Sequence, residues 1–511
     1  MAYLSQPLVL YVSLLALPIA GALVNGIGFR ANPQRGAQAT TAAIWASCLL
    51  AIAGLIFGDQ YEGAAIFGIR ADALSWIMAT LILFVSGIVH QYSQRYMAGD
   101  RRYQAFFVQL SLLTAAALLM VMADHVLLLL AGWGLSNGLL VRLMIHKTGW
   151  RASYNAGMLA LRMFFLGFLL LAFALILLAD LSGSYSLRAI LATGVDVSAS
   201  PMTTVLILIM MAALIQSALL PFHKWLTSSL NSPTPVSALM HAGLINGGGF
   251  LLARFAPLYL HQNGLLLVLF GIGVLTALVG AIWKLIQSDI KRMLACSTMS
   301  QMGFMVMQCG LGLFPAAVAH LCWHGLFKAF LFLSVGSAVS EKRQLAAFRP
   351  GTPMQFVLAC VAGLAGVVGF AYMSNKPLPI AGQPLDSTVV LLGFAFMAAT
   401  QIAQTVLQTG KPLVRLVPAL VLALLAGGLY GLSVHGIETV LAPLAIAEPQ
   451  PLHGVHLLAL STMLLIWVGM NLNLLTELQN TRLWRSLYVA ALNGSQPDAN
   501  TTTPIRTTYH V

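Results

Sequence analysis

The segment from residue 315 to 338, PAAVAHLCWHGLFKAFLFLSVGSA, has the length and apolar character of a membrane span, yet it contains His320, His324 and Lys328. Steps of four residues advance about 40° around a helix, so the three side chains form one slanted stripe. Each ionisable group placed in the centre of the hydrocarbon costs at least about 2.5–3.5 kcal/mol. Such a stripe requires a polar interior, and two imidazoles in line with an amine are typical of a proton relay. We therefore expect a membrane protein that moves ions.

The composition extends this expectation to the whole chain. Of its 511 residues, 59% are hydrophobic and only 8% are charged, whereas soluble domains contain about 25% charged residues. We therefore predict an all-α polytopic membrane protein with little mass outside the lipid bilayer. At about 20 apolar residues per span, we count about 15 spans. They are expected at residues 8–28, 37–57, 74–94, 104–122, 125–145, 157–180, 202–220, 235–253, 263–285, 293–313, 315–338, 353–373, 387–408, 414–433 and 454–474.

The net charge of +12 does not indicate a nucleic-acid partner, because the basic residues are spread over short loops rather than clustered. Loops rich in Lys and Arg alternate with loops that are poor in them, which predicts an N-terminus outside and a cytoplasmic C-terminus. We expect a multi-pass protein of the cell inner membrane. The basic loops are 29–36, 95–103, 146–156, 286–292, 339–352 (with Lys342, Arg343 and Arg349) and 409–415, and the poor ones are 58–73 (with Asp59 and Glu62) and 434–453 (with Glu438 and Glu448).

Two interruptions of the apolar pattern organise the chain. One is Leu219–Trp225, LLPFHKW, and the other is Tyr372–Pro377, YMSNKP. Broken helices at matching places in two halves are typical of transporters built from repeats, and an odd number of spans inverts the second repeat. We expect two inverted five-helix repeats at 104–253 and 263–408, preceded by N-terminal helices at 1–103 and followed by C-terminal helices at 409–474.

The remaining segment, 475–511, is expected to be cytoplasmic. Its first part combines apolar side chains with Arg482 and Arg485, which fits an interfacial helix, a helix that docks a partner, or simply a solvated helix. The last residues, SQPDANTTTPIRTTYHV, are predicted to be disordered.

Three strings of sequence resemble one known superfamily. They are PFHKWLTSSLNSPTPVSALMHAG at 221–243, SDIKRMLACSTMSQMGF at 288–304 and AHLCWHGLFKAFLFLSVG at 319–336. Together they resemble the proton-conducting antiporter-like subunits, which include subunit L of respiratory complex I and the large subunits of Mrp-type Na+/H+ antiporters. The resemblance extends over about residues 70–410. It implies two inverted five-helix repeats and a proton route through the middle of the membrane.

The resemblance assigns relay positions in this chain. His320, His324 and Lys328 match the HxxxHxxxK helix of the superfamily, and His241 matches a relay histidine or lysine. Lys376 stands where subunit L has a lysine at its second broken helix. Without the resemblance, each histidine could be a packing residue whose hydrogen bonds are satisfied between helices. Lys376 could be a lysine whose side chain reaches toward the membrane interface.

A second group of residues is expected to support the relay. Asp289, Lys291 and Arg292 match a DIKR turn of the superfamily, and Arg162 is retained. Lys284, Asp289, Lys291 and Arg292 could equally anchor a loop, and Arg162 could pair with backbone carbonyl groups. The cysteines and histidines lack metal-ligand spacing, so we expect no metal or other cofactor in this chain.

Three departures from the superfamily pattern affect the first repeat. Gly134 replaces an acidic residue, Gln216 replaces the lysine of the first broken helix, and Phe165 replaces the acidic partner of Arg162. A carboxylate beside a lysine tunes the lysine so that it can load and release a proton. We therefore predict that the first half-channel lacks this mechanism, whereas a relay through His241 and the HxxxHxxxK stripe toward Lys376 remains.

The segment at 485–494, RSLYVAALNG, resembles the tail of the DabB branch, the membrane subunits of bacterial DabA–DabB inorganic-carbon pumps. This implies inward flow of H+ or Na+ that drives a large cytoplasmic, zinc-containing, carbonic-anhydrase-like DabA partner to hydrate CO2 to bicarbonate. The chemistry would belong to the partner, so this chain is not expected to be an enzyme. The alternatives are an H+ or Na+ translocating subunit of complex I or an Mrp-type complex, and a structural anchor whose channel has decayed.

Overall fold

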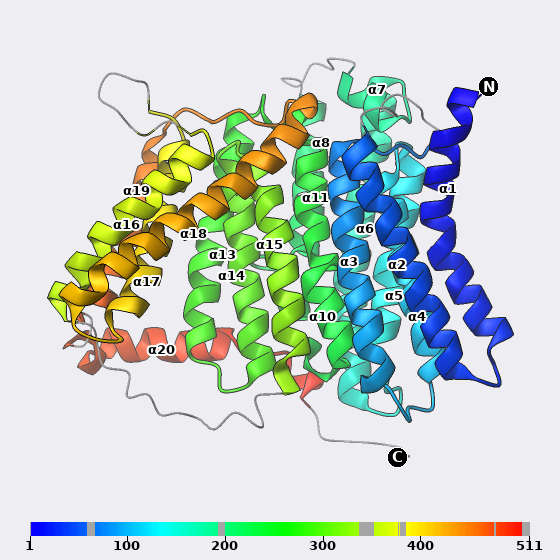
Figure 1. Cartoon of the computed structure of the whole chain (residues 1–511), viewed down its shortest axis with the longest axis horizontal. Coiled ribbons are helices and arrows are strands. Elements are labelled where there is room, and N and C mark those ends of the chain that lie inside the picture. The colour runs from blue at the N-terminus through cyan, green and yellow to red at the C-terminus, as the bar shows by residue number, and fades with distance from the viewer. Residues whose placement is uncertain are drawn as a thin grey trace.

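Helices make up most of the described chain and run side by side in one broad bundle (Figure 1). The computed structural model describes residues 2–58, 67–192, 200–336, 352–376, 378, 385–474 and 477–502. Six charged residues of the predicted loops lie outside this part of the chain: Asp59, Glu62, Glu341, Lys342, Arg343 and Arg349.

The first half of the bundle contains the N-terminal helices and the first predicted repeat (blue to green in Figure 1). Its elements are α1 (Ala2–Leu23), the π-helix η1 (Val24–Gly28), α2 (Pro33–Phe57), α3 (Ala73–Tyr96), α4 (Tyr103–Met122), α5 (Val126–Met144), α6 (Arg151–Ser182), α7 (Leu187–Ala192), α8 (Ser200–Gln216), α9 (Lys224–Thr227), the 3₁₀ turn η3 (Ser229–Asn231), α10 (Thr234–Ala242), η4 (Leu244–Asn246), α11 (Gly247–Arg254) and α12 (Ala256–Tyr259).

The second half contains the second predicted repeat and the C-terminal elements. These are α13 (Asn263–Leu285), α14 (Ile290–Gly310), α15 (Phe314–Leu333), α16 (Pro353–Met373), α17 (Thr388–Leu407), α18 (Pro412–Leu441), η6 (Ala442–Leu444), α19 (Gly454–Asn471), η7 (Glu477–Asn480), α20 (Arg482–Gly494) and η8 (Ala499–Thr501).

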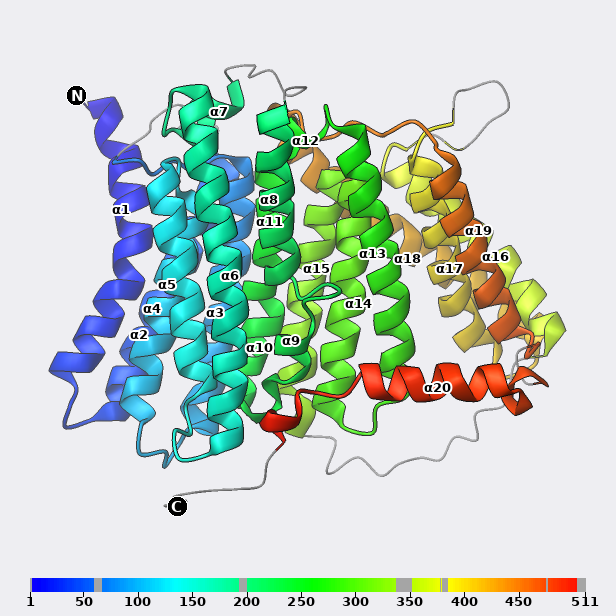
Figure 2. The same ribbon diagram turned by 180° about the vertical axis from the view of Figure 1, so that it is seen from behind.

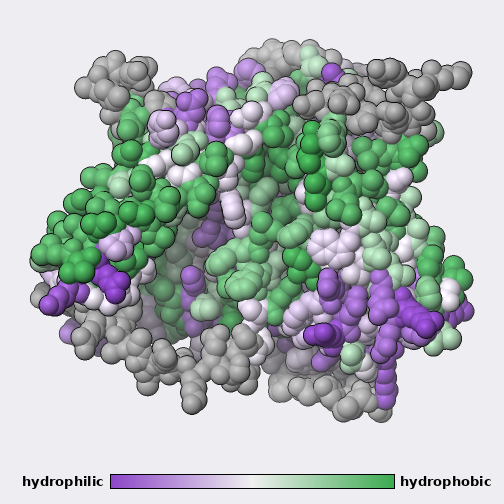
Figure 3. Space-filling view, in the orientation of Figure 1, coloured by the Kyte–Doolittle hydropathy of each residue, from purple (hydrophilic) through white to green (hydrophobic). Residues whose placement is uncertain are grey.

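The expectation of an all-helical integral membrane protein is confirmed. Within the described residues, 13 helical stretches are long and apolar enough to cross a membrane. The two other predicted spans, 202–220 and 293–313, correspond to α8, which is apolar but shorter, and to α14, which carries several polar residues. A count of 15 spans therefore stays a prediction. Hydrophobic side chains cover the middle of the surface, and hydrophilic ones gather mainly toward its two ends (Figure 3).

Successive long helices alternate in direction, and the N-terminus and α20 lie at opposite ends of the bundle (Figures 1 and 2). In consequence α4 runs opposite to α13, and each later helix of the first predicted repeat runs opposite to its counterpart in the second. α8 and α16 are the fourth long helices of their groups.

The first predicted interruption is present. α8 ends at Gln216, and the chain turns through residues 217–223 before α9 begins. A second break, at Leu244–Asn246, divides α10 from α11 and was not predicted. At the other predicted site α16 ends at Met373, and Asn375 takes a positive φ of 53°; residue 377 of that string lies outside the described residues.

Small residues bring α13 and α14 into close contact. A Cβ atom added at Gly273 would lie 2.4 Å from the backbone nitrogen of Met307, and one at Gly303 would lie 2.5 Å from that of Ala277. Backbones can approach this closely only where side chains are absent, a common arrangement in membrane helix pairs. This packing fixes the position of α14, whose other side faces α15.

The C-terminal segment is more ordered than its sequence indicated. α20 lies across the lower end of the bundle (Figure 2), where Gly494 packs against Trp283. The prediction of disorder is wrong for residues 495–502, because side chains of the bundle bind their backbone: Asn155 and Asn231 donate to the carbonyl oxygens of Asn500 and Thr501 at 2.8 and 2.9 Å. Residues 503–511 lie outside the described part.

Candidate functional site

The histidine–lysine stripe of α15 faces the protein interior. His324 and Lys328 are buried, with exposed fractions of 5% and 0%, and His320 is partly buried. The rings of His320 and His324 are nearly parallel, with centroids 6.0 Å apart and an interplanar angle of 18°. The predicted stripe therefore exists as a row of side chains inside the bundle rather than against lipid.

The ammonium group of Lys328 is held by α14. Its Nζ atom donates to the carbonyl oxygen of Leu294 at 3.2 Å. The same oxygen also accepts from the hydroxyl of Thr298, one turn later, at 3.0 Å. Leu294 is thus a shared acceptor that places the lysine next to the threonine.

His241, from α10, completes the cluster. Its Nδ1 atom lies 3.1 Å from Oγ1 of Thr298, and its ring stacks on Phe332 with centroids 4.3 Å apart. Because the hydroxyl proton of Thr298 points to Leu294, Thr298 must accept from Nδ1–H of His241. A continuous path of hydrogen bonds therefore links His241 to Lys328 through Thr298 and the Leu294 carbonyl. We call His241, His324, Lys328 and Thr298 the relay cluster.

Two buried imidazole nitrogens in and beside the relay cluster lack a hydrogen-bond partner among the described residues. His324 interacts electrostatically with His241, His320 and Lys328. The Nε2 atoms of His320 and His324 are buried and have no hydrogen-bond partner among the described residues. Buried nitrogens of this kind are normally satisfied by a partner or by ordered water. They are therefore positions where water or a transferred proton can be accommodated.

Lys376, the last predicted relay residue, lies apart from the cluster at the end of α16. Its Nζ atom forms an ion pair with both carboxylate oxygens of Glu438, at 2.7 and 2.8 Å. The sequence analysis had placed Glu438 in the loop 434–453. That boundary is wrong, because α18 continues to Leu441 with Val434 and Leu441 buried. Lys376 thus has the carboxylate partner that the first repeat lacks.

At the end of α8, which corresponds to α16 in the first predicted repeat, the polar contact is a pair of neutral amides. Gln216 at the end of α8 exchanges hydrogen bonds with Asn137 of α5, at 3.1 Å in each direction. Gln216 also donates to the carbonyl oxygen of Leu244 at 3.1 Å. Neither amide can titrate, so this contact cannot load and release a proton as a lysine–carboxylate pair does.

Three of the predicted supporting residues hold backbone or loop segments together. Asp289 caps α14 by accepting from the amide of Arg292 at 2.8 Å. Lys291 donates to the carbonyl oxygen of Ser232 at 3.0 Å, and the Arg292 guanidinium donates to Gln496 of the C-terminal segment at 3.2 Å. Their observed contacts are those of an anchoring group below the relay cluster.

The other two supporting residues do not join the cluster. Arg162 is exposed on α6, and its neighbour Phe165 is exposed as well. Lys284 is exposed at the end of α13, although its charge acts on Lys328.

Sequence reasoning missed one buried polar network near the first repeat. His90 of α3 lies 3.1 Å from the hydroxyl of Ser111, and its Nδ1 atom lies 2.8 Å from the carbonyl oxygen of Ser86. The hydroxyls of Ser86 and Thr114 are 2.6 Å apart. Thr114 and Gln216 line one small cavity. The signal was available, because polar residues recur at helical spacing in two predicted spans.

Comparisons with known proteins agree with this architecture. Residues 123–365 match the family model described as NADH:quinone oxidoreductase/Mrp antiporter, TM, and residues 64–107 match the one described as NADH-Ubiquinone oxidoreductase (complex I), chain 5 N-terminus. Over these residues the chain is similar to this family of membrane subunits. The first match contains the relay cluster and the amide pair, so both lie within the part of the chain that resembles the family.

Several curated members of the family are similar to this chain. A probable inorganic carbon transporter subunit DabB1 of Halothiobacillus neapolitanus is 42% identical over 53% of this chain and 50% of its own length. The corresponding DabB subunit of Bacillus subtilis is 35% identical over 60% of this chain and 61% of its own length. NADH-quinone oxidoreductase subunit L of Rhodobacter capsulatus is 30% identical over 75% of this chain and 59% of its own length. The alignments thus span about half to three fifths of these relatives.

A solved structure shares the fold. The Mrp complex from Dietzia sp. DQ12-45-1b superposes with a TM-score of 0.62 and 23% identity, over 95% of this chain and 59% of the other. At this identity the comparison describes the arrangement of helices alone.

Proposed function

We propose that this chain is the cation-conducting membrane subunit of an energy-coupled inorganic-carbon uptake complex. The observation that carries the proposal is the similarity to DabB subunits, 42% and 35% identical over more than half of the chain. The relay cluster supports it with a physical argument. A buried lysine and two buried histidines are costly in a membrane protein unless they line a path for ions.

The proposed route begins at His320 and passes through His324 to the relay cluster. The His320 and His324 ring centroids are 6.0 Å apart, which leaves a step for a bridging water. The hydrogen bonds among His241, Thr298, Leu294 and Lys328 hold the imidazole and the amine in place for the next step, and the Leu294 carbonyl, which only accepts, carries no proton itself. We propose that the route ends at Lys376, where the Glu438 carboxylate stabilises the charged lysine. The transported ion is H+ or Na+.

We propose two inverted five-helix repeats, 104–253 and 263–408, as the frame of this route. The opposite directions of corresponding helices support it. So does the agreement in position between Gln216, at the end of α8, and Lys376, just beyond α16, which are the fourth long helices of the two groups.

The partner in this proposal is a large DabA-like cytoplasmic subunit that holds zinc and hydrates CO2 to bicarbonate. Among the described residues of this chain, no group of three His, Cys, Asp or Glu side chains could hold a metal. We place the chain in the cell inner membrane, with its N-terminus outside and with α20 and the C-terminus in the cytoplasm. The exposed apolar side chains of α20, Leu483 and Leu487, would be available to the partner on that side.

A second candidate function is ion translocation within a respiratory or Mrp-type complex, without carbon chemistry. The structural similarity to an Mrp complex and the 30% identity to a subunit L favour it. Purification of the tagged chain in a gentle detergent, followed by mass spectrometry and zinc analysis, separates the two. A stoichiometric large soluble zinc protein supports the carbon pump. A set of small membrane subunits without zinc rejects it in favour of the antiporter complex.

Conduction itself is tested with Lys328→Ala in proteoliposomes of the purified complex. We expect proton or Na+ flux to fall by about tenfold or more, because the only amine of the relay cluster is lost. Lys411→Ala, an exposed lysine just before α18, is the matched control and should conduct normally. Unchanged flux in Lys328→Ala would reject the relay, and no flux in either the wild type or the control would favour the anchor interpretation.

A further inference from the structure

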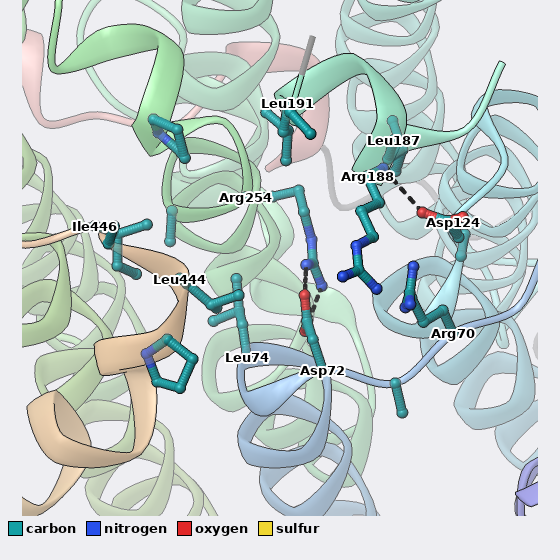
Figure 4. A pocket seen from close by; sticks show the side chains of 17 residues that line it. Arg70, Asp72, Leu74, Asp124, Leu187, Arg188, Leu191, Arg254, Leu444 and Ile446 are labelled. Carbon is teal, nitrogen blue, oxygen red and sulfur yellow. Dashed lines mark hydrogen bonds and ion pairs between the residues drawn. The ribbon is translucent and has the colours of Figure 1, made fainter. Parts of the chain in front are cut away.

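The end of the bundle opposite α20 contains a cavity with an unusual charge arrangement. Its volume is about 390 Å³, and it is lined by three arginines and two aspartates from elements far apart in the sequence. Arg70 precedes α3, Arg188 lies on α7 and Arg254 ends α11. Figure 4 shows the three guanidinium groups converging in this cavity.

Both carboxylates of the cavity already have partners. Asp72 accepts from the guanidinium of Arg254 through both oxygens. Asp124 accepts from the hydroxyl of Ser186 at 2.8 Å and from the backbone amide of Arg188 at 2.9 Å. Burial alone would raise the pKa of Asp72, but the charge and hydrogen bonds of Arg254 hold it below its ordinary value. Asp72 is therefore ionised at neutral pH and committed to Arg254.

Other donors of the cavity have no partner among the side chains that the structure describes. The guanidinium groups of Arg70 and Arg188 form no hydrogen bond or ion pair with another described side chain. Arg254 is 91% buried, since its exposed fraction is 9%, and its Nε atom has no partner among the described residues. Three guanidinium groups against two carboxylates leave the cavity with one excess positive charge.

We propose that this cavity binds a small oxyanion, either a free ion such as bicarbonate or phosphate, or the phosphate of a lipid headgroup. Planar guanidinium forks match the geometry of carboxylate, carbonate and phosphate oxygens and bind them with two parallel hydrogen bonds. An anion between Arg70 and Arg188 would also relieve their mutual repulsion. Arg254, oriented by Asp72 and by the hydroxyl of Ser75 at 3.0 Å, forms the fixed wall of the site.

The walls of the site connect separate parts of the molecule. Pro443–Ile446 line the cavity directly after α18, the helix that carries Glu438. Arg254 continues the helical segment that begins with α10, which carries His241. An anion in the cavity would therefore lie beside the end of α11, in the helical segment that carries His241, and beside the turn after α18, the helix that carries Glu438.

The test compares the purified full chain with the double variant Arg70→Gln/Arg188→Gln. Calorimetric titration with sodium bicarbonate and with sodium phosphate, at constant ionic strength in chloride, measures the free anions. Native mass spectrometry after incubation with phosphatidylglycerol measures the lipid. We expect the wild type to bind one of the three and the double variant to bind it about tenfold more weakly or not at all.

A matched control is Lys411→Gln/Arg415→Gln, which removes two charges near the start of α18, at the other end of the bundle. It should bind like the wild type. Thermal unfolding without anion should be the same for both double variants, since the cavity arginines support no described contact through their side chains. Saturable binding of bicarbonate or phosphate identifies a free ion, and retention of the lipid alone identifies a headgroup. Equal affinities in the wild type and the Arg70→Gln/Arg188→Gln variant, or no binding of any probe, would overturn the proposal.

Discussion

At the scale of single residues, Thr298 decides whether the relay histidine and lysine are connected. His241 and Lys328 lie on different helices, and the hydroxyl of Thr298 links them through the Leu294 carbonyl. A hydroxyl can donate and accept at the same time, which neither an imidazolium nor an ammonium group can do. Nothing in the string around Thr298 distinguishes it from the adjacent Ser297, so its role comes from the structure alone.

Thr298→Val keeps the shape of the side chain and removes its hydroxyl. We expect ion flux in proteoliposomes to fall by about tenfold or more, because the hydroxyl that positions His241 relative to Lys328 is lost. Thr298→Ser keeps the hydroxyl and should retain most of the flux. If the valine variant conducts as well as the serine variant, this hydroxyl does not position the relay.

At the scale of elements, the ends of α8 and α16, the fourth long helices of the two predicted repeats, carry different polar contacts. α16 and α18 meet in the ion pair of Lys376 and Glu438, whereas α5 and α8 meet in the amide pair of Asn137 and Gln216. The first contact consists of ionisable groups and the second of neutral amides. We therefore propose that the second repeat conducts and that the neutral amide pair closes the first.

The ion pair predicts non-additive effects on transport. Glu438→Gln removes the charge that stabilises protonated Lys376, so we expect flux to fall about as far as it does in Lys376→Met. The double variant should be no worse than either single variant, because both lesions interrupt the same step. Glu448→Gln, an exposed acid on the same side of the protein, serves as the control. Additive losses in the double variant would mean that the two residues act separately.

The amide pair predicts a loss of stability without a loss of transport. Asn137→Leu or Gln216→Met leaves one buried amide unpaired, which costs about 1–3 kcal/mol. The double variant should be destabilised by less than the sum of the two, as measured by unfolding in detergent. Flux through Gln216→Met should stay close to that of the wild type. A large loss of flux in this variant would place the first repeat on the conduction route.

At the scale of the whole molecule, the C-terminal segment ties the lower end of the bundle together. α20 crosses beneath α13, and the segment after it contacts α6 and the turns that precede α10. The backbone amide of Asp498 also donates to the hydroxyl oxygen of Ser228 at 3.0 Å. These contacts join the C-terminus to the loop that positions His241.

Truncation after Asn493 should therefore loosen that loop. We expect faster hydrogen–deuterium exchange in residues 224–234 of the truncated protein, because the side chains of Ser228 and Asn231 lose their backbone partners. Exchange in α4 and α5, which form no hydrogen bond with the described residues after α20, provides the internal reference. Identical exchange at 224–234 in both proteins would show that the segment does not brace the loop.

Much of the fold could be read directly from the chain. Apolar runs of about 20 residues located the long helices, because a bilayer leaves the backbone no alternative to helical hydrogen bonding. The break after α8 was visible as LLPFHKW, since proline removes a helical donor. The end of α18 was misplaced because Glu438 was taken as a loop residue, although its buried neighbours on the helix keep it in place.

For the candidate site too, the sequence predicts what is local along the chain, and the structure decides which helices meet. Spacing within one helix is local, so the sequence by itself determined that His320, His324 and Lys328 share a stripe. Its resemblance to the superfamily indicated that Gly134 and Gln216 stand where an acidic residue and a lysine are usual. Contacts between helices depend on how the helices pack, and residues dozens of positions apart carry no mutual signal in one sequence. Only the tertiary structure decided that Thr298 joins His241 to Lys328, that Glu438 pairs with Lys376, and that Arg70, Arg188 and Arg254 meet in one cavity.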